Sequence, residues 1–251
     1  MSFYKLPLLI FSGLNLLFFA CQDTQKKVTK QEDQKPLVTK LKDSLPQQSE
    51  ETTTLEVEKS GNQEDTTLFK LTNKNMREFL TIYGKENQET KVRVSTKFGA
   101  IDIRLYKETP LHRANFLYLT KQKYFDETFF YRVAKDFVIQ GGNSDRDQMA
   151  HKRFEIGDDY TIPQEQIPGK THKRGSVALS KQWVDNPSNR STPFEFFIVV
   201  AKNGAHHLDG EHTIFGEVIS GMDVVDQINK VPVDSSEWPK ENIDIKVEVL
   251  E

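Results

Sequence analysis

Apolar residues are distributed so unevenly along this chain that only its later part can form a packed core. Residues 22–65 consist mainly of Gln, Glu, Lys, Thr and Ser with isolated Leu and Val, and they contain no aromatic residue. Such a segment buries too little apolar surface to offset the entropy that is lost on ordering. We therefore predict a disordered polar tether over residues 21–65, a short helical lead-in over residues 66–90, and one folded domain over residues 91–251.

Residues 1–20 have the pattern of an export signal. One positive charge at Lys5 precedes an apolar stretch from Leu6 to Phe19. This stretch is shorter than the ~20 residues that a transmembrane helix needs, and it contains Pro7. We predict a cleaved signal peptide over residues 1–20 rather than a membrane-spanning helix.

Cys21 is the only cysteine in the chain, which excludes an intramolecular disulfide bond. The segment before it resembles a bacterial lipoprotein signal, although Phe18 and Phe19 stand where that pattern prefers a leucine and a smaller residue. The resemblance implies that Cys21 is acylated and anchors the protein without spanning the bilayer. It also implies a place in the bacterial cell envelope, on the periplasmic face of the outer membrane. An ordinary signal peptide with an incidental cysteine is the alternative.

Charge and motif content exclude several function classes. The formal net charge is -3 and no basic cluster is present, so nucleic acid is not an expected partner. His206, His207 and His212 lack the spacing that aims two imidazoles at one metal ion, and residues 143–154 lack the glycine and glutamate of a calcium loop. The folded region also has no phosphate-binding glycine loop and no cysteine nucleophile. We expect no cofactor and no metal.

Hydrophobic periodicity predicts the elements of the folded domain. Apolar residues at helical spacing predict a short helix within residues 72–84, and alternation predicts a hairpin within residues 92–105. Pro110 marks the first position of a helix, and a second helical face follows Gly221. Further strands are predicted at residues 137–139, 176–179, 196–200, 213–215 and 245–249. Many short strands with two flanking helices are typical of a barrel or sandwich.

The sequence of residues 130–143, FYRVAKDFVIQGGN, resembles the central signature of the cyclophilins. Blocks at residues 175–180, 195–198, 208–218 and 221–225 follow in the order of that family. The resemblance covers about Lys91 to Glu251. It implies a mainly β fold, a cyclophilin-like eight-stranded antiparallel β-barrel flanked by two α-helices, to which the short N-terminal helix is added. It also implies peptidyl-prolyl cis/trans isomerase activity.

The chemistry of that activity explains the residue types in these blocks. Rotation of an X-Pro bond is opposed by a barrier of ~18–20 kcal/mol from amide resonance. A catalyst must hold the proline ring in an apolar pocket and stabilise the twisted amide with a donor, for which arginine is suited. The resemblance implies that Arg132 is the catalytic donor. The substrate-binding residues that it implies are Phe130, Phe137, Val138, Gln140, Leu179, Glu195, Phe197, Leu208, His212 and Phe215. Without the family blocks, the phenylalanines would be taken for ordinary core residues.

Three departures from the family pattern affect the expected activity. Glu195 stands where the family usually has glutamine, and a carboxylate ~4 Å from a guanidinium attracts it by roughly 4 kcal/mol at a dielectric constant of ~20. The hypothesis is that Glu195 holds Arg132 away from substrate and reduces activity. Val138 in place of methionine makes the pocket shallower, and Pro193 crowds its rim.

Two function classes remain open. The first is an isomerase that acts on X-Pro bonds of exported proteins and assists their folding in the cell envelope. The alternative is a membrane-tethered proline-peptide binding or chaperone module with weak or no isomerase activity. Retention of Arg132 favours the enzyme, because a pure binder has no need of that donor. The expected partners are proline-containing polypeptides and, through the lipid anchor, a membrane, with the protein itself a monomer.

Overall fold

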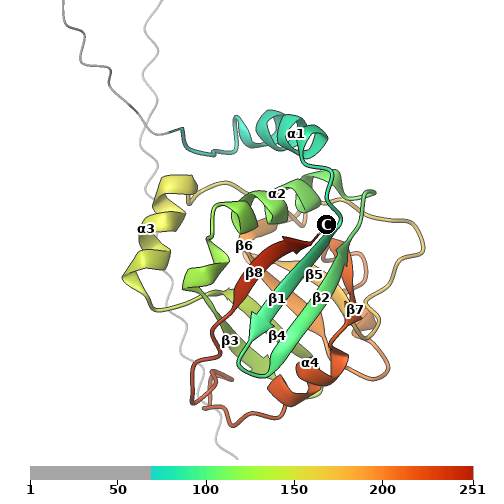
Figure 1. Ribbon diagram of the computed structural model, residues 1–251. Coiled ribbons are helices and arrows are strands. Elements are labelled where there is room, and N and C mark those ends of the chain that lie inside the picture. Colours follow the sequence, from blue (N-terminus) through green and yellow to red (C-terminus); the bar gives the residue numbers. More distant parts are fainter. Residues whose placement is uncertain (1–68, 251) are drawn as a thin grey trace, which may run out of the picture. The chain divides into compact units, whose positions relative to one another are not determined.

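The computed structural model describes residues 69–250 (Figure 1). The predicted signal peptide, Cys21 and the tether over residues 21–65 lie outside these residues. Within residues 69–250, no helix is both long enough and apolar enough to cross a membrane.

Eight strands and four α-helices make up the described part of the chain (Figure 1). The strands are β1 (Lys91–Thr96), β2 (Gly99–Leu105), β3 (Phe129–Ala134), β4 (Val138–Asn143), β5 (Ser176–Lys181), β6 (Ser191–Val199), β7 (Ile214–Ser220) and β8 (Lys246–Leu250). The helices are α1 (Met76–Glu86), α2 (Pro110–Lys121), α3 (Asp147–Ile156) and α4 (Met222–Ile228), with short 3-10 turns at η1 (Phe125–Glu127) and η2 (His206–Leu208).

The strands form one antiparallel sheet in the order β3-β4-β6-β5-β7-β2-β1-β8. The sheet curls until β3 at one end meets the segment just before β8 at the other. There the amide of Phe130 donates to the carbonyl of Ile243 at 3.0 Å, and that of Ile245 donates to Thr128 at 3.2 Å. The predicted mainly β fold with eight antiparallel strands is confirmed.

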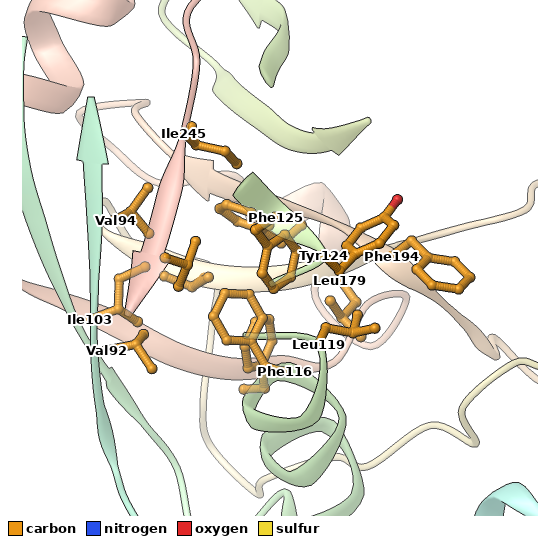
Figure 2. Close-up of a cluster of buried hydrophobic side chains, with 14 of the residues drawn as sticks. Val92, Val94, Ile103, Phe116, Leu119, Tyr124, Phe125, Leu179, Phe194 and Ile245 are labelled. Atoms are coloured by element: carbon orange, nitrogen blue, oxygen red, sulfur yellow. The ribbon is translucent and has the colours of Figure 1, made fainter. Parts of the chain in front are cut away.

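The main core fills the inside of the curled sheet (Figure 2). Phe116 on α2 lies at its centre, with ring centroids 4.8 Å from Phe125, 5.4 Å from Phe196 and 5.3 Å from Phe215. Alternating residues of β1 and β2, among them Val92 and Ile103, cover one side of this cluster. Alternation therefore places one face of each strand inward, as the sequence pattern predicts.

A second, smaller apolar cluster lies on the opposite face of the sheet. Its buried members are Ala134, Val138, Ala178, Phe197, Val199, Ala205 and Leu208. Phe196 and Phe197 show the division between the two faces, because the first belongs to the main core and the second to this cluster. The second cluster forms the floor of the candidate site.

Helix α3 is the one helix of the described region that periodicity did not predict. Its buried residues are Met149 and Ile156, while Phe154 on the same helix is 59% exposed. Because so few apolar side chains face inward, no amphipathic pattern marks the segment. The helix ends at Gly157, whose φ is 120° and where a Cβ would lie 2.0 Å from the Leu71 carbonyl oxygen, so only glycine fits.

Helix α1 packs on α2, which confirms the predicted short N-terminal helix. The ring of Tyr118 on α2 lies 4.9 Å from that of Phe79 and 5.3 Å from that of Tyr83. Arg113 on α2 donates to the carbonyls of Gly84 at 3.0 Å and Asn87 at 2.9 Å, and these bonds satisfy carbonyls at the end of α1.

Candidate active site

A pocket of about 140 Å³ opens on the face of the sheet that carries the second apolar cluster. It is lined by Arg132, Phe137, Val138, Gln140, Ser180, Lys181, Trp183, Glu195, Phe197, Leu208 and His212. The strand register explains how residues far apart in the chain meet here. Arg132 on β3 pairs with Gln140 on β4, and Gln140 pairs in turn with Phe197 on β6.

Three of the residues that the sequence assigned to substrate binding lie in the main core instead. Phe130, Leu179 and Phe215 are all 0–1% exposed and are not among the lining residues. Register shifts on both sides of Phe130 turn its ring away from the face that Arg132 occupies. Leu179 follows Ala178, which faces the pocket side, so alternation directs Leu179 inward.

Arg132 lies at the rim of the pocket with its side chain 34% exposed. Its Nη1 donates to Oε1 of Gln140 at 3.4 Å, and its Nη2 lies 2.7 Å from Oε2 of Glu237. A guanidinium presents five N–H donors. The group therefore keeps donors for a ligand in the pocket while these two contacts are made.

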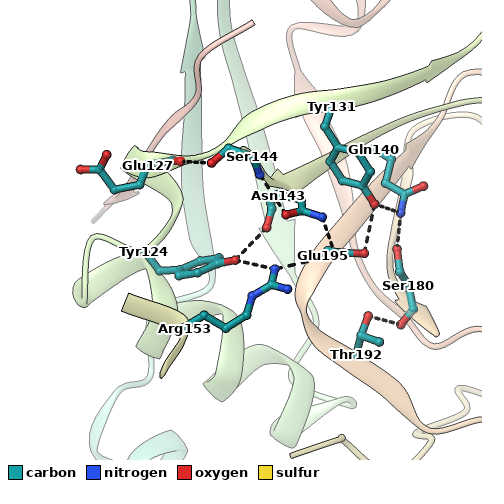
Figure 3. Close-up of polar contacts among 11 residues, drawn as sticks. Tyr124, Glu127, Tyr131, Gln140, Asn143, Ser144, Arg153, Ser180, Thr192 and Glu195 are labelled. Carbon is teal, nitrogen blue, oxygen red and sulfur yellow. Dashed lines mark hydrogen bonds and ion pairs between the residues drawn. The ribbon is translucent and has the colours of Figure 1, made fainter. Parts of the chain in front are cut away.

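A chain of hydrogen bonds fixes the orientation of Gln140 (Figure 3). Its Nε2 donates to the hydroxyl of Tyr131 and, at 2.8 Å, to Oγ of Ser180, so its carbonyl oxygen is directed to Arg132. The Tyr131 hydroxyl donates in turn to Oε2 of Glu195 at 3.0 Å. Burial, together with the Glu195 charge, raises the pKa of Tyr131, so this hydroxyl stays protonated and remains a donor.

The expected pairing of Glu195 with Arg132 is wrong. Oε1 of Glu195 accepts from Nδ2 of Asn143 at 3.1 Å and lies 3.7 Å from Nη2 of Arg153 on α3 (Figure 3). Arg153 also donates to the hydroxyl of Tyr124 at 2.8 Å. The unpredicted helix α3 therefore supplies the cation that the carboxylate at position 195 needs, and Arg132 is left to a different partner.

His212 closes one side of the pocket as a neutral imidazole. Its Nδ1 lies 3.0 Å from the Leu179 carbonyl oxygen, which can only accept, so Nδ1 carries the proton. Its ring packs edge-on against Phe197 with 5.2 Å between centroids. Burial lowers the pKa of His212 to about 4. Leu179 thus contributes to the site through its backbone rather than its side chain.

The apolar wall of the pocket is held in place by backbone and side-chain hydrogen bonds of neighbouring residues. The carbonyl of Phe137 accepts from the amide of Val200 at 2.8 Å, which ties the β3–β4 turn to the end of β6. Leu208 is held in η2 because the next residue, Asp209, accepts from the backbone amide of His172 at 2.7 Å and contacts its Nδ1 at 2.8 Å.

Sequence reasoning missed three lining residues, Ser180, Lys181 and Trp183. The first two continue β5 beyond the apolar run that predicted it. Trp183 is 71% exposed, and its ring lies 5.5 Å from that of His212. A tryptophan and a valine in the polar loop that follows a predicted strand are a signal that could have identified this rim.

The geometry suits binding and polarisation rather than covalent chemistry. An apolar recess large enough for a small ring lies beside a cationic donor and a neutral imidazole. Within residues 69–250, no group of three or more His, Cys, Asp or Glu side chains could hold a metal ion.

The profile of the family described as cyclophilin type peptidyl-prolyl cis-trans isomerase/CLD matches residues 91–249. The chain belongs to the cyclophilin family.

Two relatives differ in how much of their own length the match to this chain covers. Peptidyl-prolyl cis-trans isomerase-like 2 of Rhizopus delemar is 31% identical over 166 residues, which cover 66% of this chain and 30% of the relative. Peptidyl-prolyl cis-trans isomerase ppi1 of Schizosaccharomyces pombe is 36% identical over 155 residues, which cover 61% of this chain and 94% of the relative. The chain therefore spans less than a third of the first relative and nearly all of the second.

A solved cyclophilin supports the same assignment. The crystal structure of a Cryptosporidium parvum cyclophilin type isomerase in the presence of the dipeptide Ala-Pro is 25% identical, with a TM-score of 0.53. The match covers 64% of this chain and 99% of that one. Residues 91–249 are thus a cyclophilin-type peptidyl-prolyl cis-trans isomerase domain.

Replacing Glu195 with glutamine should destabilise this cyclophilin without activating it. The substitution removes the charge partner of Arg153, whose buried Nε already lacks a hydrogen-bond partner, so we expect a loss of about 1–2 kcal/mol in the free energy of unfolding. The value of kcat/KM should change by less than about threefold. Urea unfolding and an isomerase assay on the same preparation check both. A tenfold gain in kcat/KM would restore the hypothesis that Glu195 restrains Arg132.

The lowered pKa of His212 predicts a pH-dependent loss of stability. The unfolded state protonates this histidine near pH 6.5, whereas the folded state resists protonation until about pH 4. The stabilisation is therefore complete above pH 6.5 and is lost as the pH falls toward 4. Between pH 7 and pH 4.5, His212→Gln should lose about 2 kcal/mol less than the wild type in urea unfolding. An equal loss in both proteins contradicts the assignment.

Proposed function

We propose that this cyclophilin accelerates cis/trans exchange of X-Pro bonds in exported proteins and thereby assists their folding in the cell envelope. The observation that carries the catalytic part is the position of Arg132 at the rim of an apolar pocket. Its guanidinium is held by Gln140 and Glu237 and still has free donors.

In the proposed reaction the proline ring enters the recess formed by Val138, Phe197 and Leu208. Arg132 then donates a hydrogen bond to the substrate amide as it twists and loses its resonance. This bond stabilises the transition state more than the planar ground state, because the donor is arranged before the substrate arrives. No covalent bond is formed or broken. The dipeptide Ala-Pro named for the Cryptosporidium parvum structure is consistent with such a ligand.

The binding-module alternative loses one of the two observations that favoured it. It gained weight from Glu195 and from Pro193, and Glu195 contacts Tyr131, Asn143 and Arg153 rather than Arg132. The substrate class of proline-containing polypeptides is common to both functions. Rate acceleration, which a binding module lacks, separates them.

The proposed location rests on the sequence of the N-terminal region. We propose that the signal peptide over residues 1–20 is removed, that Cys21 is acylated, and that the protein works as a monomer on the periplasmic face of the outer membrane. Wild type and Cys21→Ala, expressed in a bacterium, test this by membrane fractionation and by the mass of the mature N-terminus. The wild type should carry lipid and sediment with membranes, and the variant should do neither. An unmodified wild-type cysteine would remove the anchor from the proposal.

A further inference from the structure

The segment between α4 and β8 forms a structured loop beside the active site. Within residues 232–240, the amide of Asp234 donates to the Trp238 carbonyl at 2.9 Å, and the Asp234 carboxylate accepts from the amides of Ser236 at 2.8 Å and Trp238 at 2.9 Å. The loop also contacts β3, because the Trp238 ring lies 5.7 Å from that of Tyr131. Its conformation is thus fixed both internally and against the strand that carries Arg132.

Glu237 has a backbone conformation in this loop that is unfavourable for a glutamate. Its φ is 64°, in the left-handed region that glycine adopts readily and a glutamate does not. Its carbonyl accepts from the amide of Val133 at 2.8 Å, so its backbone lies directly beside β3. Glycine would make the same backbone hydrogen bond without the strain. The glutamate side chain is therefore the part of this residue that needs an explanation.

The Glu237 side chain reaches the catalytic guanidinium from outside the pocket. Its Oε2 lies 2.7 Å from Nη2 of Arg132, and Glu237 is not among the residues that line the pocket. Gln140, by contrast, does line the pocket and contacts Nη1 at 3.4 Å. The shorter of the two contacts therefore comes from a residue that does not line the pocket.

We propose that Glu237 is a positioning residue that fixes Arg132 for catalysis. The proposal deepens the proposed function and rests on Arg132 being the donor. An arginine side chain has several rotatable bonds, and ordering it during the reaction costs free energy. Because the ion pair with Glu237 already orders the Arg132 side chain in the free enzyme, this free energy is not added to the barrier of the reaction. The ion pair acts on the rate through the orientation of Arg132 and leaves the apolar recess unchanged.

The decisive variant is Glu237→Gly, because activity and stability are expected to change in opposite directions. The glycine removes the ion pair and relieves the left-handed backbone strain. We expect kcat/KM for an X-Pro peptide to fall about 5–20-fold, while peptide affinity changes less than twofold and the unfolding midpoint is unchanged or raised. Glu237→Asp, which keeps the carboxylate on a shorter side chain, should recover part of the rate. If Glu237 had a merely structural role, its substitution would lower the rate and the stability of the protein together.

Lys123→Gly is the matched control. Lys123 also has a left-handed backbone, with φ of 56°, and is exposed at the end of α2. The Lys123→Gly variant should gain at least as much stability as Glu237→Gly, because it relieves the same backbone strain, and it should keep full activity. A Glu237→Gly rate equal to or above that of the wild type would overturn the proposal, since the ion pair would then be neutral or inhibitory. So would a loss of rate that occurs only with a loss of stability.

A double variant separates this proposal from the proposed function. In an Arg132→Ala background, Glu237→Gly should cause no further loss of rate, because its effect passes through Arg132. An additive loss overturns the positioning role. An inactive wild type, or a fully active Arg132→Ala, would contradict the proposed function itself, and with it this inference.

Discussion

Arg132→Ala should lower kcat/KM for a short X-Pro peptide by roughly 100-fold or more, which corresponds to the loss of one electrostatic donor to a transition state. The fold should be unaffected, because the side chain is 34% exposed and lies outside both apolar clusters. Arg132→Lys should recover little of the rate. A lysine keeps the charge but lacks the planar fork that contacts Gln140 and Glu237 together.

NMR exchange spectroscopy on the peptide measures this effect without a coupled protease. Arg93→Ala is a matched control, because Arg93 is an ion-paired, partly exposed arginine on β1 that contacts Asp102 at 2.7 Å and is absent from the pocket lining. It should keep wild-type activity. Equal activity of Arg132→Ala and the wild type would assign catalysis to another group.

Phe196→Ala and Phe197→Ala should have different consequences although the two residues are adjacent. Phe196 faces the main core, where its ring lies 5.4 Å from that of Phe116, so its removal should lower the free energy of unfolding by about 3–5 kcal/mol. Phe197 faces the smaller cluster beneath the pocket, and its removal should cost about 3 kcal/mol, at the lower end of the same range. Its main effect should be a loss of peptide affinity and at least a 30-fold fall in kcat/KM.

Both variants should be assayed at a temperature where urea titration shows them fully folded. Under those conditions Phe196→Ala should retain most of the catalytic efficiency, because its ring does not line the pocket. A larger rate loss in Phe196→Ala than in Phe197→Ala would mean that the two faces of β6 have been assigned the wrong way round.

Local patterns in the sequence were sufficient to predict most strands of the sheet. The alternation within residues 92–105 and the proline at residue 110 predicted β1, β2 and the start of α2, because each depends on neighbours close in the chain. The family blocks also predicted that Arg132 and Gln140 belong to one site. These two residues are close in the chain as well, because they pair within a single hairpin.

Features that depend on long-range contacts were not predictable in this way. Helix α3 has few buried residues, so the sequence gives little sign of it. The role of its Arg153 as the charge partner of Glu195 on β6 can be seen only in the folded chain. The register shifts around Phe130 leave no trace in its hydrophobicity, so a residue of the central family block was assigned to the wrong face. Glu237 lies in a loop without periodicity, and only the folded chain brings it to Arg132.

In this cyclophilin one pocket is expected both to bind the proline and to catalyse its isomerisation. The most direct test is an NMR titration of the purified protein with a short Ala-Pro peptide and its Ala-Ala counterpart, following His212 and Phe197 signals together with peptide cis/trans exchange. We expect the Ala-Pro peptide to shift both signals over the concentration range in which its exchange accelerates, and the Ala-Ala peptide to do neither. Accelerated exchange with unshifted pocket signals, or shifted signals without acceleration, would contradict the claim.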